Sequence, residues 1–242
     1  IGAATAFELA KLGYKTLSVD RNAEAGHGST SSSCAIIRVH YSTLDGTAFA
    51  YEGYFYWRDW AEYLGVEDER GFATFRDVGC LVTKTEANGY MANYLAHCDA
   101  LDIPYEDWSA AKVRERLPIY DMQAYFPAKR PEDANFGAPA GGEVAGGVFF
   151  PTAGYVTDPA LATHNLQRAA EAHGARFRFN ATITEILQES GRVSGVKLTD
   201  GTALHAPVVI NVGGPASSLI NAMAGVTDDM TMTTRALKQE VV

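Results

Sequence analysis

Residues 1–20 read IGAATAFELAKLGYKTLSVD and decide the fold of the chain. The apolar residues at positions 3, 6, 7 and 10 fall on one helical face and predict a helix over residues 1–12. Gly13 suits the residue that ends such a helix, and residues 15–19 predict a short strand that stops at Asp20. The segment therefore predicts a helix followed closely by a strand, as in α/β proteins.

The spacing within this segment is typical of a dinucleotide-binding unit. The third glycine of that fingerprint lets helix and strand pack closely, and an acid about 20 residues further on bonds a ribose hydroxyl. Gly2 precedes Asp20 by 18 positions. We expect Gly2 to be the third glycine, with the first strand and two glycines ahead of Ile1. Plain α/β structure explains the same spacing, so both interpretations stay open here.

A loop rich in glycine and hydroxyl residues follows the acid. Residues 26–34 read GHGSTSSSC, and such small residues expose backbone N–H groups and hydroxyls that can bind an anion. A flexible serine-rich linker is the alternative. The apolar residues 35–37 follow at once and favour a loop that is anchored on both sides.

Taken in order, these stretches resemble the FAD-dependent amine oxidoreductases of the D-amino-acid oxidase superfamily. The nearest branch holds sarcosine oxidase, dimethylglycine dehydrogenase and glycine oxidase. The resemblance implies an α/β fold, in which a FAD-binding Rossmann-like domain carries an inserted substrate domain with a mixed or antiparallel sheet. The matching residues are 1–10, 19–21, 28–30, 36–38, 154–156, 158–159 and 211–215.

The resemblance also implies where FAD binds. Asp20 would hold the adenosine ribose, Arg21 would lie by the adenine, and the backbone at Ile183 would face that base. Some members attach flavin through a histidine in the hydroxyl loop, but Ser32 stands there, so we expect non-covalent FAD. The expected cofactor-binding residues are Ile1, Gly2, Asp20, Arg21, Ser29, Thr30, Ser31, Ile183, Val212, Gly213 and Gly214.

The later part of the chain fits a second half of the nucleotide domain. Residues 157–173 predict a helix capped by Asp158 and Pro159 and ended by Gly174. Residues 181–188 and 192–199 predict a hairpin. The apolar run 207–212 predicts a strand buried on both faces, which leads into Gly213, Gly214 and a helix over 216–224. In this family such a glycine turn contacts FAD; a simple tight turn is the alternative.

The middle of the chain predicts the inserted domain. The aromatic-rich residues 49–63 predict a packed helix, and residues 79–83 and 147–150 predict strands. Residues 94–117 predict a polar helical region, and residues 233–242 another strand of this domain. The expected domains are residues 1–75 with 152–225 for FAD, and residues 76–151 with 226–242 for substrate.

Arg38 is the residue that most clearly indicates chemistry. It follows two isoleucines just after the hydroxyl loop, and a guanidinium can bind a carboxylate in a bidentate manner. In the family, an arginine at this place binds the substrate carboxylate. His40 and Tyr41 are expected near the same pocket, although plain packing explains them as well, and a surface ion pair would explain Arg38. We expect Arg38 and His40 to be the catalytic residues.

Composition excludes several function classes. The chain has 242 residues and a net charge of −9, which argues against binding nucleic acid or an anionic membrane. No apolar run predicts a membrane span, and no spacing of the six histidines predicts a metal site. Cys34, Cys80 and Cys98 form no disulfide framework, so we expect a cytoplasmic protein.

The expected reaction is oxidation of a C–N bond in a secondary amine or amino acid by hydride transfer to flavin. The expected partners are that small-molecule substrate, and oxygen or an electron-transfer partner. One alternative is a flavin 2-hydroxy-acid dehydrogenase of the same superfamily. Another is a truncated core that has no competent site.

Overall fold

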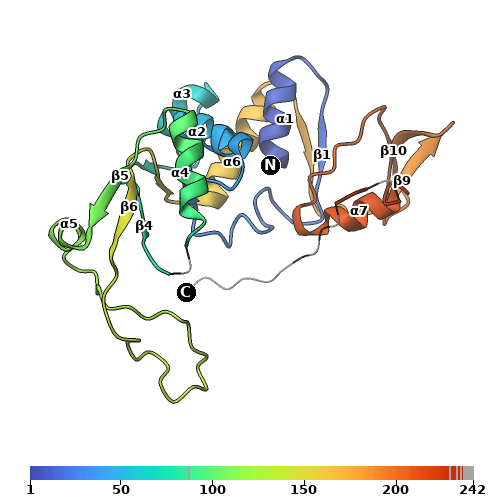
Figure 1. Ribbon diagram of the computed structural model, residues 1–242. Helices are drawn as coiled ribbons and strands as arrows, with labels where there is room; N and C mark the ends of the chain where they lie inside the picture. The colour runs from blue at the N-terminus through green and yellow to red at the C-terminus, as the bar shows by residue number, and fades with distance from the viewer. Residues whose placement is uncertain (87, 229, 233, 235, 237–242) are drawn as a thin grey trace. The chain divides into compact units, whose positions relative to one another are not determined.

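The computed structural model describes residues 1–86, 88–228, 230–232, 234 and 236 (Figure 1). The chain divides into two compact units. Unit 1 comprises Ile1–Ala35, Ala61–Thr74 and Thr157–Val242, and unit 2 comprises Ile36–Trp60 and Phe75–Val156. Residues 36–60, which the sequence analysis places with the FAD-binding domain, group with unit 2 because their first strand pairs with a strand at residues 154–156.

Unit 1 begins with the predicted helix. Helix α1 (Gly2–Lys11) buries Ala3, Ala6, Phe7 and Ala10, the expected apolar face. Gly13 has φ +85°, and this left-handed conformation lets the chain reverse. Strand β1 (Leu17–Val19) then pairs in parallel with β8 (Arg176–Arg178). The predicted helix, turn and strand are therefore confirmed.

Helix α6 (Pro159–Ala172) packs against α1. Its N-terminus is capped as predicted, because the Asp158 carboxylate accepts the Leu161 N–H at 2.9 Å and Pro159 occupies the first turn. Gly174 has φ +90° after the last turn. Alanines at positions 162, 169 and 170 are buried and keep the two helices close.

Unit 1 also contains an antiparallel three-stranded sheet in the order β11-β10-β9. The predicted hairpin is confirmed, since Ser190 and Gly191 both have positive φ, as a two-residue hairpin turn requires. Helix α7 follows a short 3-10 turn and packs against β9. The elements are β9 (Ile183–Glu189), β10 (Arg192–Leu198), β11 (Ala203–His205), the 3-10 turn (Gly214–Ala216) and α7 (Ser217–Met223).

The predicted strand at residues 207–212 is wrong. These residues form no strand, and Val208, Ile210 and Val212 are 69%, 51% and 41% exposed rather than buried. The residue between the first two, Val209, packs on the core of the three-stranded sheet. Within the described ranges no strand pairs with residues 207–212. The run therefore has the hydropathy of a buried strand but lacks the backbone hydrogen bonds to a neighbouring strand.

Unit 2 contains two antiparallel three-stranded sheets, in the orders β2-β7-β3 and β4-β6-β5. The strands predicted near residues 79–83 and 147–150 are confirmed as β4 and β6, which pair with each other. A long loop leaves the second sheet between α5 and β6 (Figure 1). The strands are β2 (Ile36–Ile37), β3 (Phe75–Arg76), β4 (Cys80–Thr83), β5 (Glu106–Ser109), β6 (Gly146–Phe150) and β7 (Gly154–Val156).

The helices of unit 2 differ in part from the prediction. The aromatic-rich segment is helical but ends at Arg58, and a short helix α3 (Trp60–Leu64) follows at the boundary of the units. The polar region 94–117 is not one helical stretch, because strand β5 interrupts it by pairing with β6. The predicted strand at residues 233–242 lies largely outside the described residues. The helices are α2 (Leu44–Arg58), α4 (Met91–Ala100) and α5 (Ala110–Arg116).

Candidate functional site

The N-terminus of α1 meets the glycine turn before α7. A Cβ on Gly2 would lie 3.1 Å from Cγ2 of Val212, closer than most Cβ contacts, so the two segments approach closely at this glycine. Gly213 donates its N–H to the Asn211 side chain at 3.0 Å, and Gly214 has φ +53°. The structure thus brings Ile1, Gly2, Val212 and Gly213 together, where the free N–H groups of a helix start can bind an anion.

Asp20 lies at the carboxyl end of β1. Its backbone N–H donates to Arg178 at 3.0 Å, and its carbonyl oxygen accepts the Ala181 N–H at 2.9 Å. Ala181, the residue bonded to Asp20, lies two residues before Ile183, where β9 begins. One carboxylate oxygen accepts the Asn22 N–H at 2.9 Å, and within the described part of the chain the second oxygen accepts no recorded hydrogen bond. It is suited to a ligand hydroxyl.

The hydroxyl loop has an ordered backbone. The Ser31 N–H donates to Gly26 at 3.0 Å, and the Ser31 hydroxyl donates to Gly28 at 3.2 Å. Gly26, with φ +83°, lies against Thr163 of α6, where a Cβ would come within 3.0 Å of a side-chain atom. Ser29 and Arg21 are exposed, and Thr30 is half-buried. No recorded hydrogen bond of the described residues joins this loop to the α1 terminus or to Asp20.

The fit of a dinucleotide to unit 1 rests on these features. A close approach at Gly2, a helix start without a side-chain cap and a carboxylate with a spare oxygen match pyrophosphate and ribose. Position 32 of the loop is a serine, and Nε2 of the histidine at position 27 of the same loop lies 3.6 Å from the Glu24 carboxylate.

Arg38 and His40 lie in unit 2. The Arg38 guanidinium is exposed and sits 4.8 Å from the ring centroid of Tyr41. No carboxylate among the described residues forms an ion pair with it. His40 is only 4% exposed, and its ring stacks on Phe150 with centroids 4.4 Å apart. Burial, and secondly the charge of Arg38, lowers the pKa of His40 to about 4, so the imidazole is neutral at pH 7.

A cluster in unit 1 that the sequence analysis missed joins Asp68, Glu69 and His164. Nδ1 of His164 lies 2.9 Å from Asp68, and Nε2 lies 3.6 Å from Glu69. These atoms lie within 4.8 Å of one another, but the two ring nitrogens serve different carboxylates. Burial alone would raise the pKa of Asp68; hydrogen bonds from Arg70, Asn165 and His164 hold it below its usual range. The hydrogen bonds that Asp68 accepts make the cluster a hydrogen-bond network.

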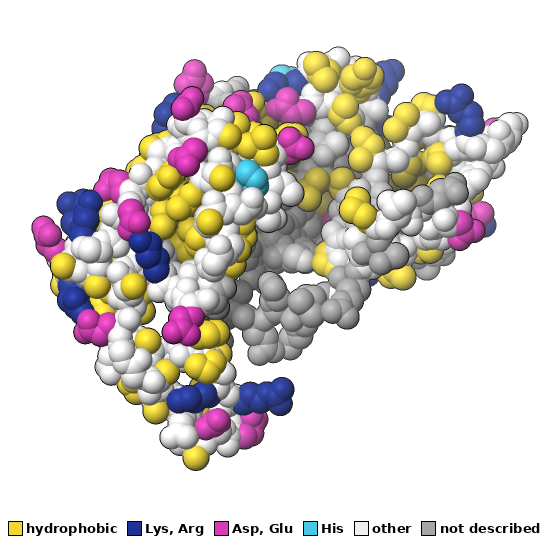
Figure 2. Space-filling model, viewed as in Figure 1, with side chains coloured by type: hydrophobic (Ala, Val, Ile, Leu, Met, Phe, Trp, Pro, Cys, Tyr) yellow, Lys and Arg dark blue, Asp and Glu magenta, His cyan; other side chains and the backbone are white. Residues whose placement is uncertain are grey.

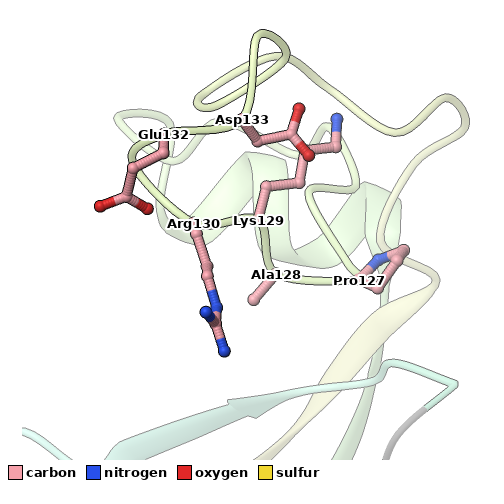
Figure 3. Close-up of a pocket in the computed structure, with 6 residues that line it drawn as sticks. All are labelled: Pro127, Ala128, Lys129, Arg130, Glu132 and Asp133. Carbon is pink, nitrogen blue, oxygen red and sulfur yellow. The ribbon is translucent and has the colours of Figure 1, made fainter.

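A hollow of about 780 Å³ lies in the long loop of unit 2 (Figure 3). None of the predicted site residues lines this hollow.

The surface carries charges of both signs. On the face drawn in Figure 2, acidic and basic side chains of the described residues are interspersed. Among the described helices, none is long and apolar enough to cross a membrane. The hollow in the long loop of unit 2 is lined by Pro127, Ala128, Lys129, Arg130, Glu132 and Asp133 (Figure 3).

Comparison with known proteins identifies the family. Two curated relatives from Cereibacter sphaeroides, a hydroxyneurosporene desaturase and a D-amino acid dehydrogenase, are each 38% identical over 58 residues, or 24% of this chain. The match covers only 12% and 13% of their lengths. The solved L-proline dehydrogenase from P. horikoshii is similar in fold, with TM-score 0.74 and 22% identity over 94% of this chain and 54% of that one.

The chain thus spans about half the length of that solved structure and far less of the curated relatives. The family model described as FAD dependent oxidoreductase, DAO, matches residues 1–242. This match covers every segment that forms the two candidate sites. The chain belongs to the DAO family of FAD-dependent oxidoreductases.

Proposed function

We propose that this chain is the core of an enzyme that oxidises the C–N bond of an amino acid or secondary amine. The observation that carries the proposal is the exposed guanidinium of Arg38, which no carboxylate of the described residues neutralises. Two relatives are named for amino-acid substrates, the D-amino acid dehydrogenase and the L-proline dehydrogenase. An amino acid carries the carboxylate that such an arginine binds.

Unit 1 would hold FAD non-covalently. The α1 terminus and the turn at Gly213 would bind the pyrophosphate, Asp20 the ribose, and the backbone at Ile183 the adenine. The hydroxyls of residues 29–31 would donate to the pyrophosphate and flavin. Bound FAD supplies a ring that accepts a hydride equivalent from the carbon next to the substrate nitrogen.

Unit 2 would bind the substrate. Arg38 would pair with the carboxylate through two parallel N–H donors, which fixes both the position and the orientation of the substrate. The substrate loses a hydride and a proton and becomes an imine, which water hydrolyses to a carbonyl compound and an amine. The electron acceptor would be oxygen or an electron-transfer partner.

The cysteines of the described residues are free thiols, which supports a cytoplasmic location.

The test is turnover of sarcosine, glycine and L-proline against glycolate and lactate by the flavin-loaded protein. We expect Arg38→Ala to raise the KM for the amino acids about a hundredfold, because a bidentate, charge-assisted contact is lost. Arg130→Ala, an exposed arginine of the same unit, is the matched control. Turnover of the hydroxy acids alone, or an unchanged KM in Arg38→Ala, would overturn the proposal.

A further inference from the structure

The segment that carries Arg38 is anchored on both sides of the guanidinium, because strand β2 directly before it pairs with β7 and the residues directly after it are buried. Val39 is fully buried and His40 nearly so, whereas Arg38 itself is exposed. Further along, Oγ1 of Thr47 accepts the Tyr41 N–H at 3.2 Å. An exposed charged side chain therefore projects from a backbone that is fixed by burial and by hydrogen bonds, which is the arrangement that keeps a binding group in place.

His40 provides the most specific of these anchors. Its ring stacks on Phe150 at 4.4 Å with an interplanar angle of 24°, and it lies 5.8 Å from the ring of Tyr94. Phe150 is fully buried in strand β6, and Tyr94 comes from helix α4. The imidazole thus ties the segment of Arg38 to the sheet and to a helix of unit 2.

The Nδ1 atom of His40 adds no hydrogen bond to this anchoring. Its Nδ1 is buried and has no hydrogen-bond partner among the described residues. Leaving such an atom unsatisfied lowers the stability of the fold. The ring is also held uncharged at neutral pH, so it neither repels Arg38 strongly nor attracts a carboxylate away from it. What the ring contributes is its flat shape.

We propose that His40 is a positioning residue, whose stacked ring holds Arg38 in the orientation that binds the substrate carboxylate. The inference rests on the proposed function, because it assumes that Arg38 binds that carboxylate. It replaces direct contact between His40 and substrate with an action through the backbone. A flat apolar ring should therefore serve as well as the imidazole.

The test measures acetate binding to the flavin-loaded protein through the NMR resonance of the Arg38 Nε–H group, assigned with Arg38→Lys. We expect His40→Phe to keep the acetate Kd within about twofold of wild type, because the ring stack remains. His40→Ala, and His40→Leu with its larger side chain, both remove the stacked ring. Each should raise the acetate Kd about tenfold, because a displaced guanidinium loses part of its bidentate contact. Turnover should show the same change in KM, with kcat largely kept.

Ile103→Ala is the matched control, because Ile103 lies in the hydrophobic cluster that contains Phe150, the ring on which His40 stacks. It should lower stability without changing the acetate Kd. An Arg38 resonance that does not respond to acetate in the wild type would overturn the proposed function. A response that is as strong in His40→Ala and His40→Leu as in the wild type would overturn only the role of His40, and so would a tenfold loss in His40→Phe.

Discussion

Among the described residues, unit 1 buries the polar side chain of Asn165, and unit 2 buries those of Thr47 and His40. Asn165 and His40 differ in how their polar atoms are satisfied. In unit 1, Asn165 is fully buried. Its amide donates to Asp68 at 2.7 Å and to the Gly71 carbonyl at 2.8 Å, and its oxygen accepts the Ala73 N–H at 3.0 Å. In unit 2, His40 is almost as buried, yet its Nδ1 has no partner among the described residues.

The difference separates a structural polar group from a candidate functional one. The Asn165 network ties the loop at residues 68–73 to helix α6, and every bond in it stabilises that connection. His40 carries an unsatisfied atom next to the one exposed arginine that we expect to bind substrate. A cost in stability of this kind is tolerated where the arrangement serves a site.

Asn165→Leu should give the largest effect and would sharpen the comparison. The substitution removes three hydrogen bonds and leaves the Ala73 N–H and the Gly71 carbonyl without their partner. We expect the free energy of unfolding to fall by about 4 kcal/mol, measured by urea denaturation. Asn93→Leu, which removes one exposed hydrogen bond to Ser42, should cost under about 1 kcal/mol. Equal losses in both variants would break the comparison.

His40→Phe should have the opposite sign. The substitution keeps the stack on Phe150 and removes the unsatisfied Nδ1, so the free energy of unfolding at pH 7 should rise by about 1 kcal/mol. Lower stability at pH 7 would mean that Nδ1 is satisfied in solution.

The pH dependence of stability gives the same comparison a second readout. The folded-state pKa of His40 is about 4, below its ordinary value of 6.5, so between these values the unfolded chain binds more protons than the folded chain. The free energy of unfolding therefore falls as pH drops from 6.5 to 4, by up to about 3 kcal/mol from this residue. The fall should be smaller by that amount in His40→Phe. If the free energy of unfolding changed with pH in the same way in the wild type and in His40→Phe, this prediction would be contradicted.

Arg70→Ala should give the smallest effect. Arg70 pairs with Glu24 at 3.4 Å on the surface, while its backbone N–H, which the variant keeps, donates to Asp68 at 2.8 Å. We expect a loss of less than about 0.5 kcal/mol in the free energy of unfolding, because exposed ion pairs contribute little. A loss near that of Asn165→Leu would show that surface charge, not the buried network, holds the loop.

The sequence correctly predicts those helices and turns whose ends are marked by capping or turn residues close by in the chain. Helix α6 has its cap at Asp158 and its stop at Gly174, and the hairpin turn needs only Ser190 and Gly191 to adopt positive φ. These features depend on a few neighbouring residues, so a single sequence suffices to place them.

Features that depend on distant partners were not predictable. Residues 207–212 have the composition of a buried strand, but strand formation requires a neighbouring strand, and none of the described residues provides it. The sequence predicts helix over residues 94–117, which include strand β5. Local sequence does not indicate this strand, because its pairing with β6 joins residues about 40 positions apart. The Asn165 network likewise joins residues more than 90 positions apart. The burial of His40 depends on Phe150, which nothing near residue 40 indicates.

Titration of the flavin-free protein with FAD tests the central claim most directly. Asp200→Ala is a matched control for Asp20→Ala, because both aspartates lie in unit 1 and accept a backbone N–H two residues on at 2.9 Å. We predict that Asp20→Ala raises the Kd for FAD about tenfold through loss of the ribose contact. Asp200→Ala and Arg38→Ala should bind FAD as tightly as wild type. Unchanged FAD affinity in Asp20→Ala would contradict the account.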